Sequence, residues 1–288
     1  MKKQCPNPQC KSEEFSKNGF YQRRSDSRII QRFKCRSCSK RFSNATFSLE
    51  LHQNKRHLNH SVFKLLGSGV SMRRIALILN IDKKTVQRKF DFLAIKARDK
   101  QEELLYKMNN KVEHMQFDDL ITIEHTKLKP VSVSIAVDAT TRVILGAQTS
   151  RIPAFGHLAK ISRKKYGRRK SEHKQGLDQL FKKIHPCIKS NAKLRSDEHK
   201  FYPEFVATYL KDCKHERFKG GRACVVGQGE LKRLARDPLF AINHACAMFR
   251  DNIKRLARKS WCTTKKVEAL QKHLDIYLWF HNEKLLTG

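Results

Sequence analysis

The sequence predicts an α/β protein whose strand layer is preceded by two small N-terminal modules. Short runs of alternating or continuous apolar residues, typical of strands, recur through the middle of the chain and are joined by amphipathic helical segments. Two cysteine pairs lie near the N-terminus, and a stretch with helical periodicity separates them from the first strand. Strands followed by alternating helices and strands are typical of a layered α/β core rather than a helix bundle.

The elements of the core are predicted from hydrophobic periodicity. Strands are expected at Met115–Ile123, Val131–Val137, Val143–Thr149 and Ala192–Asp197, and helices at Gly176–Ile188, Tyr202–Leu210, Pro238–Cys262 and Val267–Leu286. Asp138 falls between two of these strands and is expected to be a turn residue rather than a ligand.

Composition indicates a nucleic-acid partner. The chain has 288 residues, with 61 Lys and Arg against 27 Asp and Glu, and a formal net charge of +34. Such self-repulsion destabilises a compact chain unless a polyanion screens it, and phosphate contacts supply most of the binding energy to nucleic acid. Ribosomal or membrane-surface binding is the alternative, although 17 phenylalanines indicate globular cores. We find no apolar run of about 18 residues and no secretory signal, so we expect a cytoplasmic protein with no membrane partner.

The four N-terminal cysteines have the spacing of a metal site. Cys5 and Cys10 form one pair and Cys35 and Cys38 the other, each near a tight turn, with strand-like residues between them. Four thiolates can close tetrahedrally on one structural Zn²⁺, and a ribbon this small needs the metal to fold. The alternative is two chance pairs or a disulfide pair. Because nine cysteines stand in a chain without an export signal, we predict a zinc ribbon over residues 1–48.

A helix-turn-helix is predicted over residues 52–96. Ser71 can cap one helix and Asp82 the next, with a turn at Asn80 between them. The second helix has an apolar stripe and an outward polar face suited to a DNA major groove, formed by Lys83, Lys84, Gln87 and Arg88. A plain helical hairpin with a solvated charged face is the alternative. A charged helical connector is expected over residues 97–113.

The predicted core contains isolated acids in strand-like contexts. Asp118 and Asp119 lie within an apolar strand, where a carboxylate is costly unless something pairs with it, and a divalent cation would do so. Asp197 ends the later strand, at the edge where α/β sheets hold their ligands. The alternative for Asp118 and Asp119 is a strand end or turn, and that for Asp197 is a helix N-cap or turn aspartate.

Two basic segments of the core are expected to contact DNA. Residues 156–175 contain the stretch KISRKKYGRRK, which is predicted to be a disordered or DNA-laying loop carrying Lys164, Lys165, Arg168 and Arg169. The helix predicted at Pro238–Cys262 is expected to present Asn243 near the strand ends and to aim Arg250 and Lys254 along the same line. Arg255 is also expected to bind DNA.

Four stretches together resemble a known family. They are CPNPQC with FKCRSCSKRF, QFDDLITIEH, RSDEHKFY and FRDNIKRLARKSWCTTKK. On these residues the chain resembles the DDE transposases of bacterial and archaeal insertion sequences, in the small-element group with a zinc ribbon and a helix-turn-helix. The resemblance implies an RNase H-like catalytic core over residues 114–288. It also implies that acids on the first strand, the fourth strand and a late helix hold two Mg²⁺ or Mn²⁺ ions.

The resemblance implies a residue for each of the three acid positions, but only two of these residues are acids. Asp118 takes the first position and Asp197 the second, but the third, usually a glutamate seven residues before the helix arginine, falls on Asn243. Glu230 is then the nearest other carboxylate and Asp237 the next; otherwise this copy is inactive. The implied function is binding of terminal repeats followed by DNA cleavage and strand transfer, by a homo-oligomer on double-stranded DNA near the nucleoid. The alternatives are a domesticated DNA-binding regulator that has lost catalysis and a nuclease that cuts without joining.

Overall fold

The computed structural model describes residues 4–24, 27–51, 53–219, 237–257 and 262–286. The chain divides into two compact units, Met1–Val62 and Phe63–Gly288. Helix α1 (Asn59–Gly67) begins in the first and ends in the second. Among the described residues, no helix is both long enough and apolar enough to span a bilayer.

The first unit is built on a small antiparallel sheet. Its strands are β1 (Phe15–Gln22), β2 (Ile29–Cys35) and β3 (Arg41–Ser43), in that order, followed by the 3₁₀ turns Asn44–Phe47 and Arg56–Leu58. Phe15, Phe33 and Phe42 pack edge to face or tilted beside the cysteines, with ring centroids 5.4–5.7 Å apart. This core is small, so apolar burial alone gives it little stability.

The second unit is organised on a five-stranded mixed sheet in the order β6-β5-β4-β7-β8. Strands β4, β5 and β6 are antiparallel neighbours, whereas β7 runs parallel to β4 and β8 parallel to β7. Their bounds are β4 Val112–Glu124, β5 Thr126–Asp138, β6 Ile144–Arg151, β7 Ile188–Asp197 and β8 Lys214–Phe218. The four strands predicted from periodicity all form. Asp138, expected in the turn, is instead the last residue of β5 and pairs with Met115, and its carboxylate accepts hydrogen bonds from Thr140 and Thr141 of the following turn.

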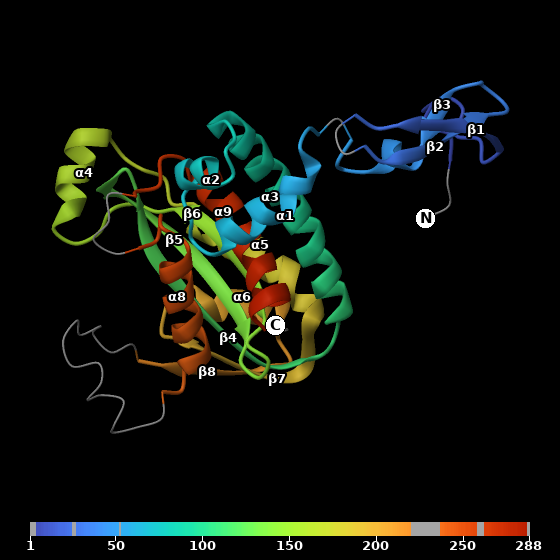
Figure 1. Ribbon diagram of the computed structural model, residues 1–288. Helices are drawn as coiled ribbons and strands as arrows, with labels where there is room; N and C mark the ends of the chain where they lie inside the picture. Colours follow the sequence, from blue (N-terminus) through green and yellow to red (C-terminus); the bar gives the residue numbers. More distant parts are fainter. Residues whose placement is uncertain (1–3, 25–26, 52, 220–236, 258–261, 287–288) are drawn as a thin grey trace. The chain divides into compact units, whose positions relative to one another are not determined.

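Helices cover both faces of this sheet (Figure 1). Helices α5 (His173–Ile184) and α6 (Tyr202–Tyr209) bury one face, where Phe117 meets Phe181 and Tyr202. Helix α8 (Phe240–Asn252) contacts β4 and β5, and a hydrogen bond from the Ile242 amide to Gln116 fixes it to β4. Residues Gln116 and Phe117 are neighbours in β4, so α8 and the pair α5 and α6 lie on opposite faces.

The β6 edge of the sheet is covered by side-chain amides. Gln101 donates to the carbonyls of Ile144 and Leu145, while Gln271 accepts from the Thr149 amide and donates to the carbonyl of Ala147. These side chains belong to α3 (Lys83–Lys107) and α9 (Val267–Phe280), which pack on each other, and α9 also packs on β6. Satisfying the edge in this way removes a template for pairing with another chain.

The helical segment before the sheet follows its predicted caps. Helix α2 (Met72–Ile78) is capped by Ser71, and α3 by Asp82, which accepts from the Lys84 amide at 2.6 Å. Asn80 turns the chain between them with a φ of +47°. The boundary expected at residue 96 lies inside α3, which is one continuous helix, and from Phe63 onward this segment belongs to the second unit.

Two predictions of secondary structure were wrong. The basic segment expected as a loop forms helix α4 (Leu158–Tyr166), and α5 already begins at His173. Straight-chain Lys and Arg favour helix, and the buried Ser162 fixes α4 by donating to the Leu128 carbonyl at 2.8 Å.

The helix predicted at Pro238–Cys262 covers only Phe240–Asn252. Ile253 is extended, and the Asn252 carbonyl abuts Gly69, where an added Cβ would lie 2.9 Å from that oxygen. Ile253 and Leu256 are still buried, because the turn after α8 folds them inward. The remaining short elements are the 3₁₀ turn His185–Cys187 and the π-helical turn His281–Leu285.

Candidate active site and metal centre

The first unit brings its four predicted cysteines together. The sulfurs of Cys5 and Cys38 lie 3.5 Å apart and those of Cys10 and Cys35 3.7 Å apart, although 33 and 25 residues separate them in sequence. Tetrahedral coordination by bonds of about 2.3 Å separates sulfurs by about 3.8 Å. The cluster can therefore hold a metal ion, and none of its cysteines forms a disulfide.

The second cysteine pair is prepared to ionise. Backbone N–H groups of Cys38 and Ser37 point at the Cys35 sulfur and lower its pKa to about 6. The Lys40 amide forms a hydrogen bond to the Cys38 sulfur and lowers the pKa of that thiol. The tight turn after β2 supplies these donors, and a thiolate, not a thiol, is the form that binds metal.

The register of the second unit brings Asp118 and Asp197 to the same place. Gln116 of β4 pairs with Arg195 of β7, and the two acids follow two residues further along each parallel strand. Side chains at this spacing point to the same face, which is the face that carries α8. Residues 79 positions apart are thus placed side by side by the parallel pairing.

The electrostatics of Asp118 identify an uncompensated negative site. Burial, followed by the charge of Asp197, raises the pKa of Asp118 to about 7. Arg250 of α8 acts in the opposite direction, but too weakly to reverse the effect. Two carboxylates that repel each other in a partly buried place fit the binding of a cation.

Helix α8 supplies the other side of this site. Cys246 is buried there, and burial together with the Asp118 charge raises the pKa of its thiol to about 12. Asn243 lies one turn earlier and is exposed; its amide nitrogen donates to the Asp237 carboxylate at 2.8 Å. Asp237 also accepts from the Leu239 amide at 2.9 Å, so it caps the approach to α8.

The remaining predicted residues near this site are distributed differently from the expectation. Lys254 lies in the turn after α8 and is exposed, not on the helix itself. Arg255 is half-buried near His273, and burial lowers the pKa of its guanidinium. Glu230 lies outside the described residues.

Asp119, the neighbour of Asp118, faces the opposite side of the sheet. Its carboxylate is within hydrogen-bonding distance of His173 at 2.8 Å and of Tyr202 at 2.9 Å, and the His173 ring lies 4.9 Å from that of His199. Sequence reasoning missed this group. The only available signal was the alternation of a strand, which requires adjacent aspartates to point apart.

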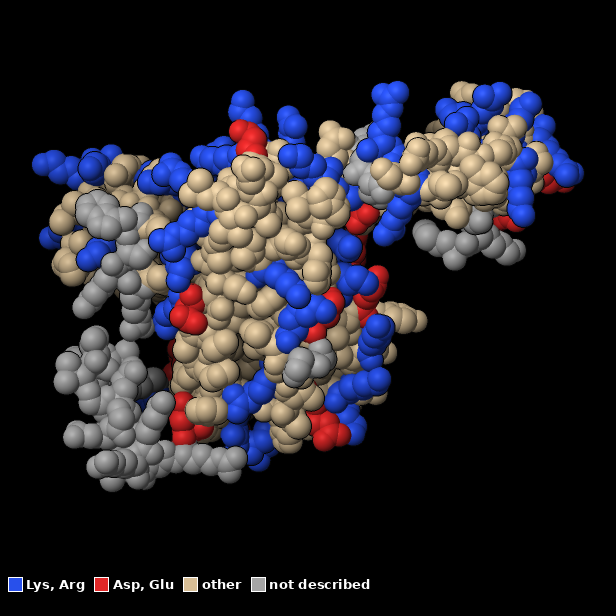
Figure 2. Space-filling model, viewed as in Figure 1, with Lys and Arg blue, Asp and Glu red and all other residues tan. Residues whose placement is uncertain are grey.

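The predicted recognition helix exposes its polar face. Its four predicted DNA-contacting residues are exposed, whereas Val86, Phe90 and Leu93 are buried as expected. Gln87 donates to Asp91 one turn on, at 3.2 Å. Figure 2 shows lysine and arginine side chains gathered around α2 and α4 on this face of the second unit.

The basic helix α4 exposes Lys164 and Lys165, and Arg168 follows it in the exposed chain. A cavity of about 470 Å³ lies between α4 and this following segment, with Arg163, Arg168 and Lys170 among its lining residues. Arg169 differs from the others, because it reaches Glu124 at 2.9 Å and is only 16% exposed.

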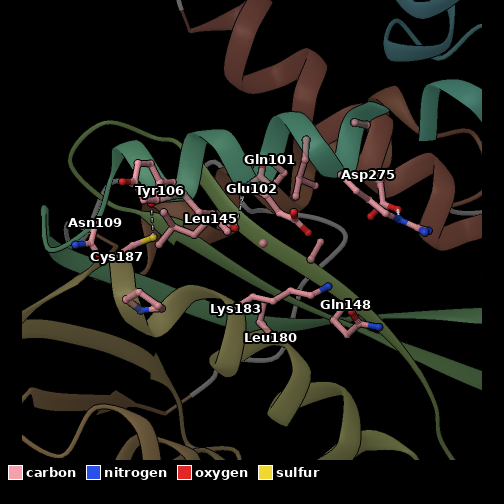
Figure 3. A pocket seen from close by; sticks show the side chains of 17 residues that line it. Gln101, Glu102, Tyr106, Asn109, Leu145, Gln148, Leu180, Lys183, Cys187 and Asp275 are labelled. Atoms are coloured by element: carbon pink, nitrogen blue, oxygen red, sulfur yellow. Dashed lines mark hydrogen bonds and ion pairs between the residues drawn. The ribbon is translucent and has the colours of Figure 1, made fainter. Parts of the chain in front are cut away.

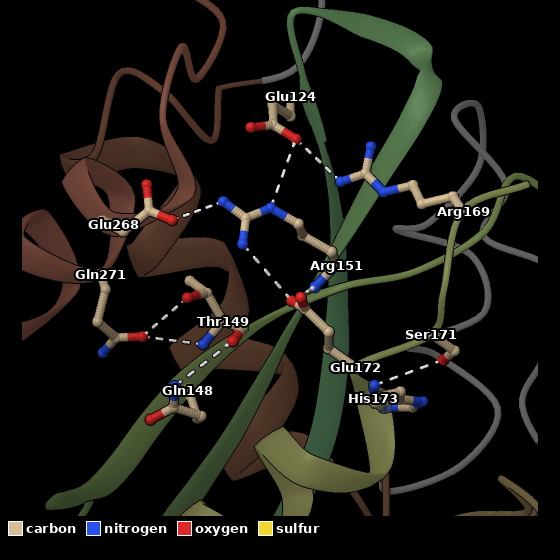
Figure 4. Close-up of polar contacts among 10 residues, drawn as sticks. All are labelled: Glu124, Gln148, Thr149, Arg151, Arg169, Ser171, Glu172, His173, Glu268 and Gln271. Carbon is tan, nitrogen blue, oxygen red and sulfur yellow. Dashed lines mark hydrogen bonds and ion pairs between the residues drawn. The ribbon is translucent and has the colours of Figure 1, made fainter. Parts of the chain in front are cut away.

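Figure 4 shows that Arg169 belongs to a network of ion pairs. Arg151 of β6 lies at its centre and contacts Glu124, Glu172 and Glu268. The network joins the end of β4 to the start of α5 and to α9, so it anchors the return of the chain from α4 to the sheet.

A separate cavity of about 400 Å³ lies between α3, α5 and β6 (Figure 3). Its floor is apolar, with Leu145, Leu180 and Cys187, and its rim carries Glu102 and Lys183. Neither Asp118 nor Asp197 lines it, so this cavity is not part of the carboxylate site.

The raised pKa of Asp118 predicts a pH-dependent stability. An acid whose pKa is higher in the folded chain loses its proton less readily there, so ionisation destabilises the fold as pH rises from about 4 to about 7. The loss should be on the order of 4 kcal/mol and constant above that range. Asp118→Asn should remove this decline. Denaturant unfolding from about pH 4.5 to 8, without added divalent ions, measures it, and identical pH curves for variant and wild type would contradict it.

Comparison with models of known protein families gave no match, and comparison with curated proteins gave none either.

Proposed function

We propose that the chain is a DDE-type transposase, which binds the ends of its element and catalyses metal-dependent DNA cleavage and strand transfer. The observation that carries the proposal is the pair Asp118 and Asp197, brought together from neighbouring parallel strands with the pKa of Asp118 raised. The strand order β6-β5-β4-β7-β8 supports an RNase H-like core, because it makes the first and fourth core strands neighbours. That adjacency is what the resemblance to this family requires of the two acids.

The side chains at the carboxylate site suit phosphodiester chemistry. Asp118 and Asp197 would hold Mg²⁺ or Mn²⁺, which when bound activates a water or 3′-hydroxyl nucleophile and stabilises the leaving oxygen. Arg250 lies near enough to Asp118 to influence its pKa and can orient a scissile phosphate. The buried Cys246 keeps its proton and gives this side of the site an apolar floor.

The third ligand position involves Asn243. Its amide nitrogen donates to Asp237, so its oxygen is the atom that would serve as a ligand. Asp237 is engaged twice at the start of α8, which makes it a support for Asn243 rather than a direct ligand. Glu230 is the candidate if the third ligand is a carboxylate.

The four-cysteine centre is proposed to hold one Zn²⁺. The sulfur separations of 3.5 and 3.7 Å fit tetrahedral thiolate coordination of one metal ion. The metal would then stabilise a basic ribbon that contacts phosphates.

DNA contacts are proposed for the exposed face of α3 and for α4. A net charge of +34 supplies the general attraction to phosphate. Lys164, Lys165 and Arg168 are exposed and can contact phosphate groups directly. Arg169 and Arg255 are half-buried and are better suited to supporting these surfaces than to contacting phosphate.

The central test is cleavage of the element's own ends. Purified protein is mixed with Mg²⁺ and a DNA fragment carrying the repeats that flank its element, with scrambled repeats as control. Nicks at the repeat boundary, followed by joining to a target, support the proposal. Specific binding without cleavage in Mg²⁺ or Mn²⁺ favours the alternative of a regulator without catalysis, which the asparagine at position 243 makes the second candidate.

Gln87 is expected to read sequence. As an exposed amide on α3 it can pair with a base edge, which is worth about 1–3 kcal/mol of discrimination. Gln87→Ala should therefore weaken binding to repeat ends more than binding to scrambled DNA in a gel-shift titration. Lys84→Ala is the matched control on the same face and should weaken both equally, as loss of a phosphate contact does. Equal losses for Gln87→Ala on the two DNAs would exclude base reading.

A further inference from the structure

The Asp119 carboxylate is a buried hub whose hydrogen-bonding capacity is filled. One oxygen accepts from Ser132 at 2.8 Å and from Ser134 at 2.5 Å. The other accepts from Tyr202 at 2.9 Å and contacts the His173 ring nitrogen at 2.8 Å. Donors on every side favour the charged form, so the pKa of Asp119 is lowered despite its burial.

The donors come from three elements, β5, α5 and α6, that meet Asp119 on the side of β4 opposite to Asp118. Ser132 and Ser134 belong to β5, His173 begins α5, and Tyr202 begins α6. Asp119 itself lies on β4, and its amide donates to the Asp118 carboxylate at 2.7 Å. The hub thus joins β5, α5 and α6 to the strand that carries Asp118.

The same hub reaches the second acid. Asp197 accepts from the His199 amide at 3.0 Å, and this turn leads directly into α6 at Tyr202. A hydrogen bond from Tyr202 to Asp119 therefore fixes the far end of the turn that begins at Asp197. One carboxylate constrains the backbone on both sides of the Asp118–Asp197 pair.

We propose that Asp119 is a positioning residue, which holds Asp118 and Asp197 in register for cation binding through its contacts with Tyr202, His173 and the β5 serines. The proposal rests on the proposed function. Asp119, His173 and His199 also place ligand atoms within 4.8 Å of one another. However, a cation on Asp119 would have to displace donors that already fill both oxygens, so we assign the group to positioning.

Tyr202→Phe tests this with little change in packing. It removes one hydroxyl from a side chain that is 1% exposed and keeps the ring that meets Phe117. Tyr209→Phe is the matched control, because its hydroxyl also leaves α6 to meet a carboxylate, Asp178, at 2.6 Å, but away from the hub. Ser134→Ala is a second hub variant that removes a donor from the other oxygen.

Binding of Mn²⁺ to the whole chain is measured from the electron paramagnetic resonance signal of free Mn²⁺. Binding that is lost in Asp118→Asn is taken as binding at the carboxylate site. We expect Tyr202→Phe and Ser134→Ala to weaken the Asp118-dependent binding by about tenfold, and Tyr209→Phe to change it less than about twofold. If the hub had a purely structural role, Tyr202→Phe and Ser134→Ala would lower the unfolding temperature without changing the Mn²⁺ affinity of the folded protein.

The outcomes separate the two proposals. Asp118-dependent Mn²⁺ binding that is the same in Tyr202→Phe, Ser134→Ala and wild type overturns the positioning role alone. Absence of Asp118-dependent binding in the wild type overturns the proposed function and the positioning role with it. Weakened binding in the two hub variants, with the control unchanged, supports both.

Discussion

Replacement of Asp118 by Asn is expected to reduce Mg²⁺-dependent DNA cleavage by about 10²–10³-fold or more, while DNA affinity stays within about twofold. The side chain keeps its shape but loses the charge that, together with Asp197, makes the site attractive to a cation. Phosphate binding is spread over many of the 61 Lys and Arg residues, so one carboxylate contributes little to it. Cleavage rate and gel-shift affinity on the same DNA separate the two effects.

The matched control is Asp212→Asn, the same isosteric change at an exposed acid in the turn after α6. It should leave both cleavage and binding unchanged. Wild-type cleavage by Asp118→Asn would remove Asp118 from the metal site and with it the main support for a DDE mechanism.

Asn243→Glu then distinguishes an active site from a decayed one. We expect no gain in cleavage, because a glutamate here would lose the hydrogen bond to Asp237 and place a second negative charge beside it. If the asparagine were a decayed third acid, the restored carboxylate should raise cleavage strongly. Glu230→Gln in the same assay tests the other candidate, and full activity of that variant would exclude Glu230 as a ligand.

Removal of the metal proposed for the four-cysteine cluster is expected to unfold the first unit and leave the second folded. A structural Zn²⁺ contributes roughly 10–16 kcal/mol of apparent binding free energy, which such a small sheet cannot replace by apolar burial. The double variant Cys35→Ser, Cys38→Ser should therefore lose one equivalent of zinc and become sensitive to protease within residues 1–62. The second unit has its own core and should keep its unfolding transition.

Metal analysis and limited proteolysis of the full-length chain measure these effects. Cys213→Ser, Cys262→Ser is the control, since these two thiols lie outside the four-cysteine cluster. Unchanged zinc content in the Cys35, Cys38 double variant would contradict the assignment.

Local features of this protein were determined by the sequence alone. The four core strands, the caps at Ser71 and Asp82 and the turn at Asn80 all depend on residues within a few positions of each other. The cysteine cluster was also predicted, because paired spacing near turns is itself a local signal. Hydrophobic alternation and capping chemistry act over such short distances that no tertiary information is needed.

Features that depend on strand register, or on which charged groups meet in the folded chain, were decided by the tertiary structure. Asp118 meets Asp197 only because β4 and β7 pair in parallel at one particular offset, which no local pattern encodes. Arg169 pairs with Glu124, and Asp119 gathers donors from β5, α5 and α6, because folding brings those charges within reach. Helix α8 ends at Asn252, where its last carbonyl lies against Gly69, a residue far away in the sequence. Contacts between residues far apart in sequence determine these features. Such contacts form only when the whole sheet is assembled, so no local pattern predicts them.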